Sequence, residues 1–245
     1  MYNLMPDRTL IIQRNLVLPP SRPIGPLVDA SPAPRPEHIT LQGRYVTLVP
    51  LSPVHSDALY HLSHGDNAHV WDYLFEGPFP DQASFAAHIA VKSASKDPLF
   101  FAILDKSGCA IGYATLMRID TTHRVIEVGN ILYTPALQRT PGATEAMYLL
   151  AKTIFELGYR RYEWKCNALN APSRRAAARF GFTFEGIFRQ HMIVKGRNRD
   201  TAWYSMLDAE WPAICHAYES WLNPDNFEAA GQQKISLSHL MEHKS

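Results

Sequence analysis

The sequence predicts an α/β protein with one mixed sheet, and three patterns along the chain carry this prediction. From residue 39 onward, segments with the periodicity of strands alternate with segments that have the periodicity of helices. Between residues 99 and 133, three strand-like segments follow one another through short turns, which is typical of antiparallel pairing. Further along, strand–helix–strand steps favour parallel neighbours. We expect a central mixed sheet of about six to seven strands flanked by helices.

The first part of the folded region is predicted to hold one strand, two helices and a three-stranded meander. Residues 44–51 alternate and are rich in β-branched side chains, which indicates a strand. Ser52 and Pro53 form a typical helix start, so we expect a helix from there to about residue 64. A second helix is expected over 81–95, and the strands of the meander over 99–105, 109–119 and 124–133.

The second part begins with the clearest amphipathic helix of the chain, which Gly158 ends. One face of it carries an apolar stripe at i, i+3, i+4, i+7 and i+8, formed by Met147, Leu150, Ala151, Ile154 and Phe155. A strand over 161–166, a helix over 172–180 and a strand over 182–194 should follow. A turn at 196–198, a strand over 201–207 and a helix over 211–222 complete the prediction.

The composition excludes several classes of protein. With 245 residues and 46% hydrophobic residues, the chain can fill one domain of up to about 200 residues, with some chain left over. A net charge of +1 provides no general field for nucleic acid or an anionic membrane, and no apolar run reaches the roughly 18 residues of a membrane span. The three cysteines are widely spaced, which favours free thiols in a reducing, cytoplasmic location.

Prolines mark the boundary of an N-terminal arm. Eight of the 18 prolines lie within the first 36 residues, and each fixes φ and removes a backbone donor. We therefore predict an extended arm over 1–37, docked or loose, a folded domain over 38–212, and a C-terminal helix and tail over 213–245. Four arginines in the arm raise the alternative of a transit peptide, but the prolines interrupt any amphipathic helix there.

The loop before the amphipathic helix has the features of an anion site. A strand ends at Tyr133, a loop with Arg139 follows, and the helix begins soon after. Unpaired N–H groups and the positive dipole end of a helix, beside an arginine, bind phosphate well. An ordinary capped helix is the structural alternative. Glu145 would repel an anion unless its carboxylate points away and Arg139 outweighs it.

Three separated motifs resemble those of one enzyme family. The Gln138 loop with its Ala-Thr-Glu-Ala run at 143–146 resembles the pyrophosphate loop of the GNAT N-acetyltransferases, in the Q-x-x-G-x-A-T-E-A form of the RimJ/RimL-like branch. Residues 170–186 are similar to the N-x-x-S…G-F-x-x-E-G motif of that branch, and residues 196–200 to its G-R-x-R-D turn. Residues 71–79 resemble its acceptor-side loop. The resemblance covers about residues 38–212.

The resemblance implies the acyl-CoA N-acyltransferase fold, with acetyl-CoA as co-substrate and no metal. In this fold the strand at 124–133 splays from its neighbour, and its backbone pairs with pantetheine and faces the thioester oxygen. The implied acceptor contacts are Trp71, Tyr73 and Phe79. The implied coenzyme contacts are Ile131, Leu132, Tyr133, Gln138, Arg139, Thr140, Gly142, Ala143, Thr144, Asn170 and Ser173. One departure is Pro141, which stands at the place of the loop glycine, with Gly142 beside it, and offers no N–H to a phosphate.

Glu127 is the candidate general base. It lies on the strand at 124–133, where alternation would put Glu127, Gly129, Ile131 and Tyr133 on one face. The alternatives are an ion pair with Arg124 or another cation, and deprotonation through ordered water. Weaker carboxylate candidates are Asp72, Asp120 and Glu163.

Ser173 is the candidate partner of the leaving sulfur. In the resemblance, Asn170 and Ser173 face the coenzyme, and the serine hydrogen-bonds or protonates the thiolate. The structural alternative is that both residues only cap a short helix. Some relatives place a tyrosine acid four residues beyond this serine, but Ala177 stands there in this chain.

These features predict an acetyl-CoA-dependent N-acetyltransferase that acts by direct transfer to a primary amine of a small molecule. A protein N-terminus or lysine is the alternative acceptor. Pro141 and Ala177 favour a further alternative, a catalytically silent acyl-CoA-binding module. We expect no nucleic-acid or membrane partner, and a monomer or homodimer.

Overall fold

In the computed structural model of the protein, residues 22–242 are described. The chain divides into two units, residues 1–30 and residues 31–245. Residues 22–30 of the first unit are exposed and have no helix or strand. The predicted arm over 1–37 thus lies partly outside the described residues, as does the end of the predicted C-terminal tail. Among the residues described, no helix has both the length and the apolar character needed to span a membrane.

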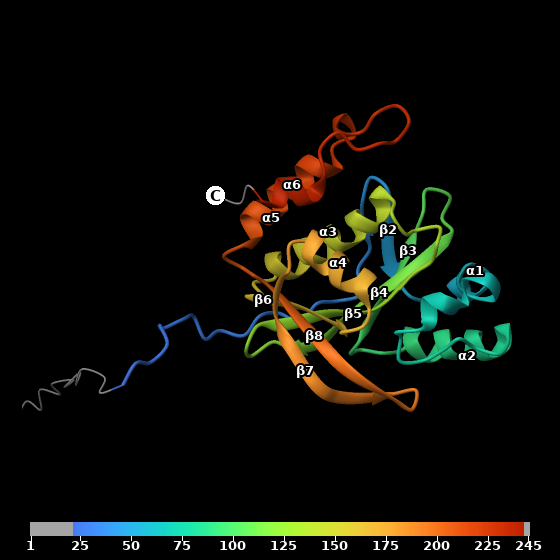
Figure 1. Ribbon diagram of the computed structural model, residues 1–245, viewed down its shortest axis with the longest axis horizontal. Coiled ribbons are helices and arrows are strands. Elements are labelled where there is room, and N and C mark those ends of the chain that lie inside the picture. Colours follow the sequence, from blue (N-terminus) through green and yellow to red (C-terminus); the bar gives the residue numbers. More distant parts are fainter. Residues whose placement is uncertain (1–21, 243–245) are drawn as a thin grey trace, which may run out of the picture. The chain divides into compact units, whose positions relative to one another are not determined.

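The second unit is built on one mixed sheet of eight strands in the order β1-β2-β3-β4-β5-β6-β8-β7 (Figure 1). Only β5 and β6 are parallel; the other neighbours pair antiparallel. This confirms the predicted α/β class, with one strand more than expected. The additional strand is β1, whose two residues are too few to show alternation. The bounds are β1 Leu41–Gln42, β2 Thr47–Pro50, β3 Leu99–Leu104, β4 Ala110–Asp120, β5 Val125–Tyr133, β6 Arg161–Asn167, β7 Thr183–Val194 and β8 Arg197–Leu207.

Helices cover both faces of the sheet, and the alternation along β3 shows why. Leu99, Phe101 and Ile103 join the hydrophobic cluster beneath α3, whereas Phe100 and Ala102 join the cluster beneath α1 and α2. Two apolar faces require two helical layers. The helices are α1 Ser56–Ser63, α2 Gln82–Ser93, α3 Pro141–Glu156, α4 Ala171–Arg179, α5 Trp211–Leu222 and α6 Leu237–Glu242.

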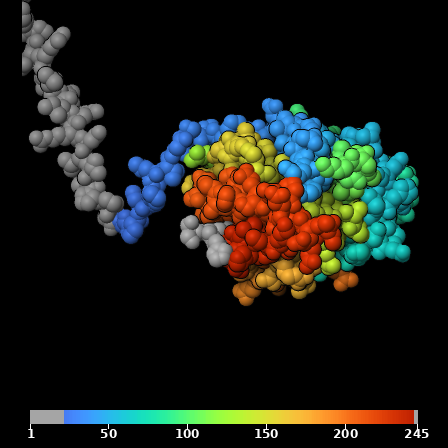
Figure 2. All heavy atoms as spheres, turned by 90° about the horizontal axis from the view of Figure 1, so that it is seen from above, coloured from blue at the N-terminus to red at the C-terminus, as the bar shows by residue number. Residues whose placement is uncertain are grey.

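The C-terminal segment packs on the α3 side of the sheet. The ring of Trp211 stacks on Phe155 of α3 at 5.0 Å between centroids. Beyond α5, the short helix α6 buries Leu237 and Met241 in the same cluster, so the segment predicted as a tail contains a packed helix. Six residues carry too little periodicity to predict it. Figure 2 shows this segment as a continuous red surface over one side of the folded unit.

The last residues of the predicted arm are docked. Ala33 is buried, and its N–H donates to the carbonyl of Thr121 at 2.9 Å. Arg35 donates to the carbonyl of Lys96 at 2.8 Å and pairs with Asp97 at 3.6 Å. Residues 31–37 therefore belong to the second unit.

The hairpin of β7 and β8 is tighter than predicted. Val194 pairs with Arg197, so the turn consists of Lys195 and Gly196, which both have positive φ, 50° and 71°. Two such residues form the turn type that matches the twist of a hairpin. The residues predicted as a turn at 196–198, and those up to 200, therefore belong mostly to β8. This places Arg199 on the sheet instead of in a loop.

Candidate functional site

The sheet opens between β5 and β6. The two strands pair only from Val125 with Arg161 to Val128 with Trp164. Beyond that point, residues 129–133 of β5 pair only with β4, and residues 165–167 of β6 pair only with β8. The free edge of β5 can therefore pair with an extended ligand, as the resemblance implied for this strand.

A β-bulge sits in the free half of β5. Thr115 pairs with Gly129 but Tyr113 pairs with Leu132, so β5 has one extra residue there. Asn130 adopts φ +46°, a conformation that asparagine tolerates better than most residues. The bulge reverses the alternation, because Leu132 then faces the α1–α2 side and Ile131 the α3 side. The predicted common face of Glu127 and Ile131 is therefore wrong.

The start of α3 lies beside this free edge. Thr140 caps the helix, accepting a hydrogen bond from the N–H of Ala143 at 3.2 Å. Pro141 occupies the first helical position, where an N–H has no partner within the helix in any case. Gln138 ties the loop to the strand, because its Nε2 donates to the carbonyl of Tyr133 at 2.8 Å. Arg139 is exposed next to the helix start.

Gly142 is required by a close approach to β2. A Cβ at this position would lie 2.6 Å from Cγ1 of Val46, which is buried. The missing side chain thus lets the first turn of α3 pack against Val46, the residue just before β2.

Replacing Gly142 by alanine is expected to destabilise the protein by about 1–3 kcal/mol, because the new methyl group overlaps Val46 and the helix start must move. Urea unfolding measures this effect. The double variant with Val46→Ala removes the overlap, so it should lose less stability than the sum of the two single variants. Strict additivity would contradict the close approach.

Glu145 does not face the loop. Its two carboxylate oxygens accept the backbone N–H groups of Arg44, Tyr45 and Val46 at 2.7, 2.6 and 2.9 Å. The side chain is buried on the β2 side of α3, at 5% exposure for the residue. Its charge is therefore directed away from an anion at the start of α3. An anion site there required this orientation, because a carboxylate facing the loop would repel the anion.

Thr144 is also engaged within the fold. Its hydroxyl accepts a hydrogen bond from Nη1 of Arg179 at 2.9 Å. Arg179 lies over the ring of Trp221 at 4.9 Å. The side chain of Thr144 therefore joins α3 to α4.

The start of α4 shows the capping contact that was the structural alternative for Asn170 and Ser173. Asn170 caps the helix, because its Oδ1 accepts the N–H of Ser173 at 3.1 Å. Oγ of Ser173 accepts the indole N–H of Trp164 at 3.1 Å. Indole only donates, so the serine keeps its own proton to donate. Burial raises the pKa of the Cys166 thiol, which lies on β6 two residues beyond Trp164.

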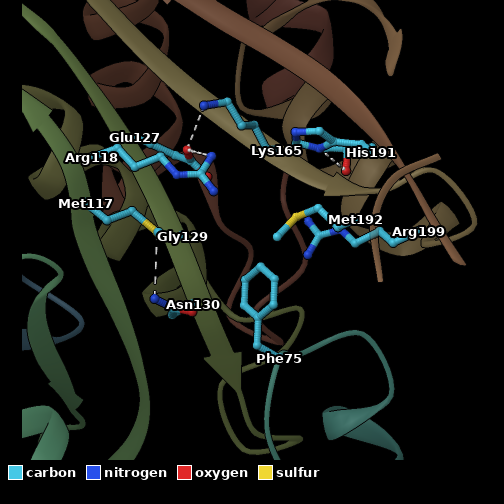
Figure 3. Close-up of a pocket in the computed structure, with 11 residues that line it drawn as sticks. Phe75, Met117, Arg118, Glu127, Gly129, Asn130, Lys165, His191, Met192 and Arg199 are labelled. Carbon is cyan, nitrogen blue, oxygen red and sulfur yellow. Dashed lines mark hydrogen bonds and ion pairs between the residues drawn. The ribbon is translucent and has the colours of Figure 1, made fainter. Parts of the chain in front are cut away.

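On the opposite face of the sheet, a cavity of about 30 Å³ lies over β5, β6 and β8 (Figure 3). Glu127 is 4% exposed, and its Oε2 contacts Nη1 of Arg118 at 3.0 Å and Nζ of Lys165 at 2.8 Å. Its Oε1 lies beside Gly129, where a Cβ would be 3.6 Å away. One oxygen is thus held by two cations, and the other lies beside the start of the bulge. His191 also lines the cavity, and its Nδ1 is 3.0 Å from Oγ1 of Thr201.

The ion pair of Glu127 belongs to a longer network. Lys165 also binds Glu163 at 2.7 Å, and Glu163 binds Arg161 at 2.7 Å. Arg161 in turn pairs with Glu185 at 2.5 Å, which lowers the pKa of Glu185 to about 2. Glu163 does not line the cavity, although it shares Lys165 with Glu127.

The other carboxylate candidates lie elsewhere. Asp120 is bound to His123 at 2.7 Å, and Asp72 is exposed on the acceptor-side segment. Across residues 22–242, no group of three or more His, Cys, Asp or Glu side chains is arranged to hold a metal ion.

The predicted acceptor-side aromatics are mostly part of the core. Trp71 is 1% exposed, donates to the carbonyl of Ser63 at 2.8 Å and packs edge-on against Phe79 at 5.5 Å. The hydroxyl of Tyr73 donates to the carbonyl of Leu169 at 3.3 Å, which connects this segment to the loop before α4. Neither Trp71 nor Phe79 lines the cavity, whereas Phe75 of the same segment does.

The sequence match agrees with this geometry. The family described as "Acetyltransferase (GNAT) domain" matches residues 46–183, more than half of the chain. The chain belongs to the GNAT acetyltransferase family. Transfer of an acetyl group from acetyl-CoA is the activity of this family. No curated protein matches the chain at a significant level.

Solved GNAT structures resemble the chain over most of its length. A GCN5-related N-acetyltransferase from Brucella melitensis is 52% identical, with a TM-score of 0.85 over 87% of this chain and 99% of that one. A GNAT-family protein from Chromobacterium violaceum is 44% identical, with a TM-score of 0.73 over 80% of this chain and 100% of that one. An acetyl-CoA and AMP complex of the microcin C7 self-immunity acetyltransferase is 21% identical, with a TM-score of 0.60, and shares the fold.

Several cavity residues of this GNAT protein were not predicted from the sequence. They are Phe75, Met117, Arg118, Asn130, Lys165, Met192, Arg199 and Thr201. The one signal for them was on β6, where Glu163 and Lys165 alternate with Tyr162 and Trp164. Charged residues on one face of an internal strand require charged partners on the neighbouring strand, and Glu127 is that partner.

Proposed function

We propose that this GNAT protein is an acetyl-CoA-dependent N-acetyltransferase that transfers the acetyl group directly to a primary amine of a small molecule. The observation that carries the proposal is the free, bulged half of β5. It lies between the start of α3 on one side and the cavity with Glu127 on the other. One ligand along this edge can therefore have its phosphates at a helix start and its acyl end near a carboxylate.

The residues at the opening fit acetyl-CoA. Arg139 supplies a positive charge beside the start of α3, and the carboxylate of Glu145 is directed away from it. The edge at 131–133 would pair with the pantetheine, and Asn170 and Ser173 would lie near the sulfur. When bound, acetyl-CoA supplies an acyl group that is activated for attack by an amine.

The chain's own groups divide the remaining work. Oε1 of Glu127 accepts the proton of the amine, while Arg118 and Lys165 hold the carboxylate through Oε2. A backbone N–H of the bulge stabilises the negative charge that develops on the carbonyl oxygen. The hydroxyl of Ser173 donates to the departing sulfur, because its oxygen is already fixed by Trp164.

The test is a thiol-release assay with acetyl-CoA across amino sugars, polyamines, amino acids, amine drugs and peptides. We expect turnover with at least one class of small amine. Faster turnover with peptides would favour a protein N-terminus or lysine as acceptor, as in the RimJ/RimL-like branch that the motifs resemble. Binding of acetyl-CoA without turnover of any amine would overturn the proposal in favour of a silent module.

Replacing Ser173 by alanine is expected to lower kcat by about 10- to 100-fold, because the leaving sulfur loses its donor. Stability should fall by about 1–3 kcal/mol, because the buried indole N–H of Trp164 loses its acceptor, whereas the cap of α4 by Asn170 through the backbone N–H of Ser173 is retained. Steady-state kinetics and calorimetric binding of CoA measure the two effects separately. An unchanged kcat would assign the proton to water.

A cytoplasmic location and a monomer or homodimer complete the proposal. The widely spaced cysteines support the location, and all three, Cys109, Cys166 and Cys215, are free thiols. Size-exclusion chromatography with light scattering tests the oligomeric state, and a larger assembly would contradict it.

A further inference from the structure

Arg199 is a buried cation in the acceptor-side cavity. It lies on β8, opposite Met192 of β7, and only 6% of it is exposed. Figure 3 shows its guanidinium pointing into the cavity beside Met192 and toward Phe75. The guanidinium carbon is 4.8 Å from the centroid of the Phe75 ring, a cation–π contact.

This guanidinium lacks the partner that a buried charge requires. Its Nε is buried and has no hydrogen-bond partner, and none of the ion pairs within residues 22–242 includes Arg199. Burial lowers the pKa of Arg199, but a guanidinium keeps its charge at neutral pH. A buried charge without a carboxylate or phosphate is costly, and a ring face offsets this only in part.

The neighbouring charges are already matched to one another. The network beside the cavity joins three cations to three carboxylates: Arg118, Lys165 and Arg161 with Glu127, Glu163 and Glu185. Asp200, next to Arg199 in the sequence, accepts instead from the N–H of Gln190 at 2.7 Å and from Nδ2 of Asn198 at 3.0 Å. Among the arginines and lysines that line the cavity, Arg199 is therefore the one without a carboxylate partner within the described residues.

We infer that Arg199 binds an anionic group of the acceptor, and that the acceptor is a small primary amine that carries a carboxylate, as an amino acid does. The part of this inference that concerns acetylation of the amine rests on the proposed function. Glu127 and Arg199 line the same cavity from β5 and β8, so one can bind the amine and the other the acid. A guanidinium binds a carboxylate through two parallel hydrogen bonds, and a cavity of about 30 Å³ favours a compact group.

The experiment compares amines that differ only in their acid group. L-amino acids are assayed beside their α-carboxamides, and O-phosphoethanolamine beside ethanolamine, in the wild type, Arg199→Gln and Arg197→Gln. Arg197 is the matched control, because it is an exposed arginine on the same strand and does not line the cavity. For each protein, kcat/KM for the acid is divided by kcat/KM for the amide, and this ratio is compared between the proteins. The two substrate amines differ in basicity, but this difference affects the ratio equally in every protein and therefore cancels.

We expect the acid-to-amide ratio to fall by about 10- to 100-fold in Arg199→Gln and to stay unchanged in Arg197→Gln. Arg199→Lys should keep part of the preference, because it retains the charge without the planar fork. The same ratio in the wild type and in Arg199→Gln would overturn the inference. A preference for O-phosphoethanolamine over every amino acid would overturn the carboxylate assignment.

A binding measurement separates this inference from the proposed function. N-acetylglycine and N-acetylglycinamide are titrated calorimetrically into each protein with CoA present. One outcome is that no amine is acetylated, but N-acetylglycine binds more tightly than N-acetylglycinamide, and does so only in proteins that retain Arg199. In that case the proposed function fails and the anion site stands. Equal binding of both probes to the wild type overturns the anion site. This comparison needs only the wild type, so it remains a test even if Arg199→Gln does not fold.

Discussion

Glu127→Gln is expected to lower kcat/KM for the amine by about 10²- to 10⁴-fold, the range that removal of a general base costs. Glutamine has almost the same shape, but it cannot accept the proton of the amine. Binding of acetyl-CoA should be retained, because the predicted contacts with the coenzyme lie on β5, α3 and α4 and do not involve this carboxylate. Stopped-flow or steady-state kinetics and calorimetry measure the two quantities.

Glu163→Gln is the matched control for this prediction. Glu163 contacts the same Lys165, at 2.7 Å compared with 2.8 Å for Glu127, but it does not line the cavity. Both variants remove one carboxylate from the same network, so both should lose similar stability. We expect Glu163→Gln to lower kcat/KM by less than about tenfold. Equal losses in the two variants would assign the proton to water and leave Glu127 a purely electrostatic role.

The fold could be predicted from the sequence because its layers are recorded in local periodicity. The short continuous apolar run of β3 and the stripe on α3 report which side chains are buried, and burial decides the elements. The bulge at Asn130 could not be predicted, because a bulge depends on the register with the partner strand, which no local pattern contains. The predicted turn of β7 and β8 is wrong for a related reason, since pairing, and not composition, extends β8 to Arg197.

The two sides of the site differ in how far the sequence can predict them. The start of α3 is contiguous in sequence, so the sequence predicts a loop followed by a helix start there, and the structure identifies Thr140 as the cap and Pro141 as the first helical residue. The acceptor-side cavity is assembled from six separated segments, and its charges are meaningful only as pairs. Arg118 and Lys165 meet at Glu127 through strand order alone, and a linear pattern does not specify strand order.

The largest effect on stability is expected from Glu145→Ala, at about 3–5 kcal/mol. The side chain accepts three backbone N–H groups in the turn between β1 and β2, one buried and two partly buried, and a hydrogen bond to a charged group contributes about 1.5–3 kcal/mol. Gly43 is adapted to this contact, because a Cβ there would lie 2.4 Å from Oε2 of Glu145. For a unit of this size, the loss corresponds to a decrease in Tm of about 8–15 °C.

Two further variants identify the cause of this loss. Glu156→Ala removes a carboxylate from the same helix that is exposed and pairs only with Lys152, so it should cost less than about 1 kcal/mol. Glu145→Gln keeps the size but turns one acceptor into a donor that faces backbone N–H groups, so it should cost nearly as much as alanine. If glutamine is tolerated, the carboxylate of Glu145 contributes mainly by filling space. If it is not tolerated, the charge of Glu145 fixes the turn between β1 and β2, against which the first turn of α3 packs. The same charge then also fixes the helix start that is proposed to bind the phosphates of acetyl-CoA.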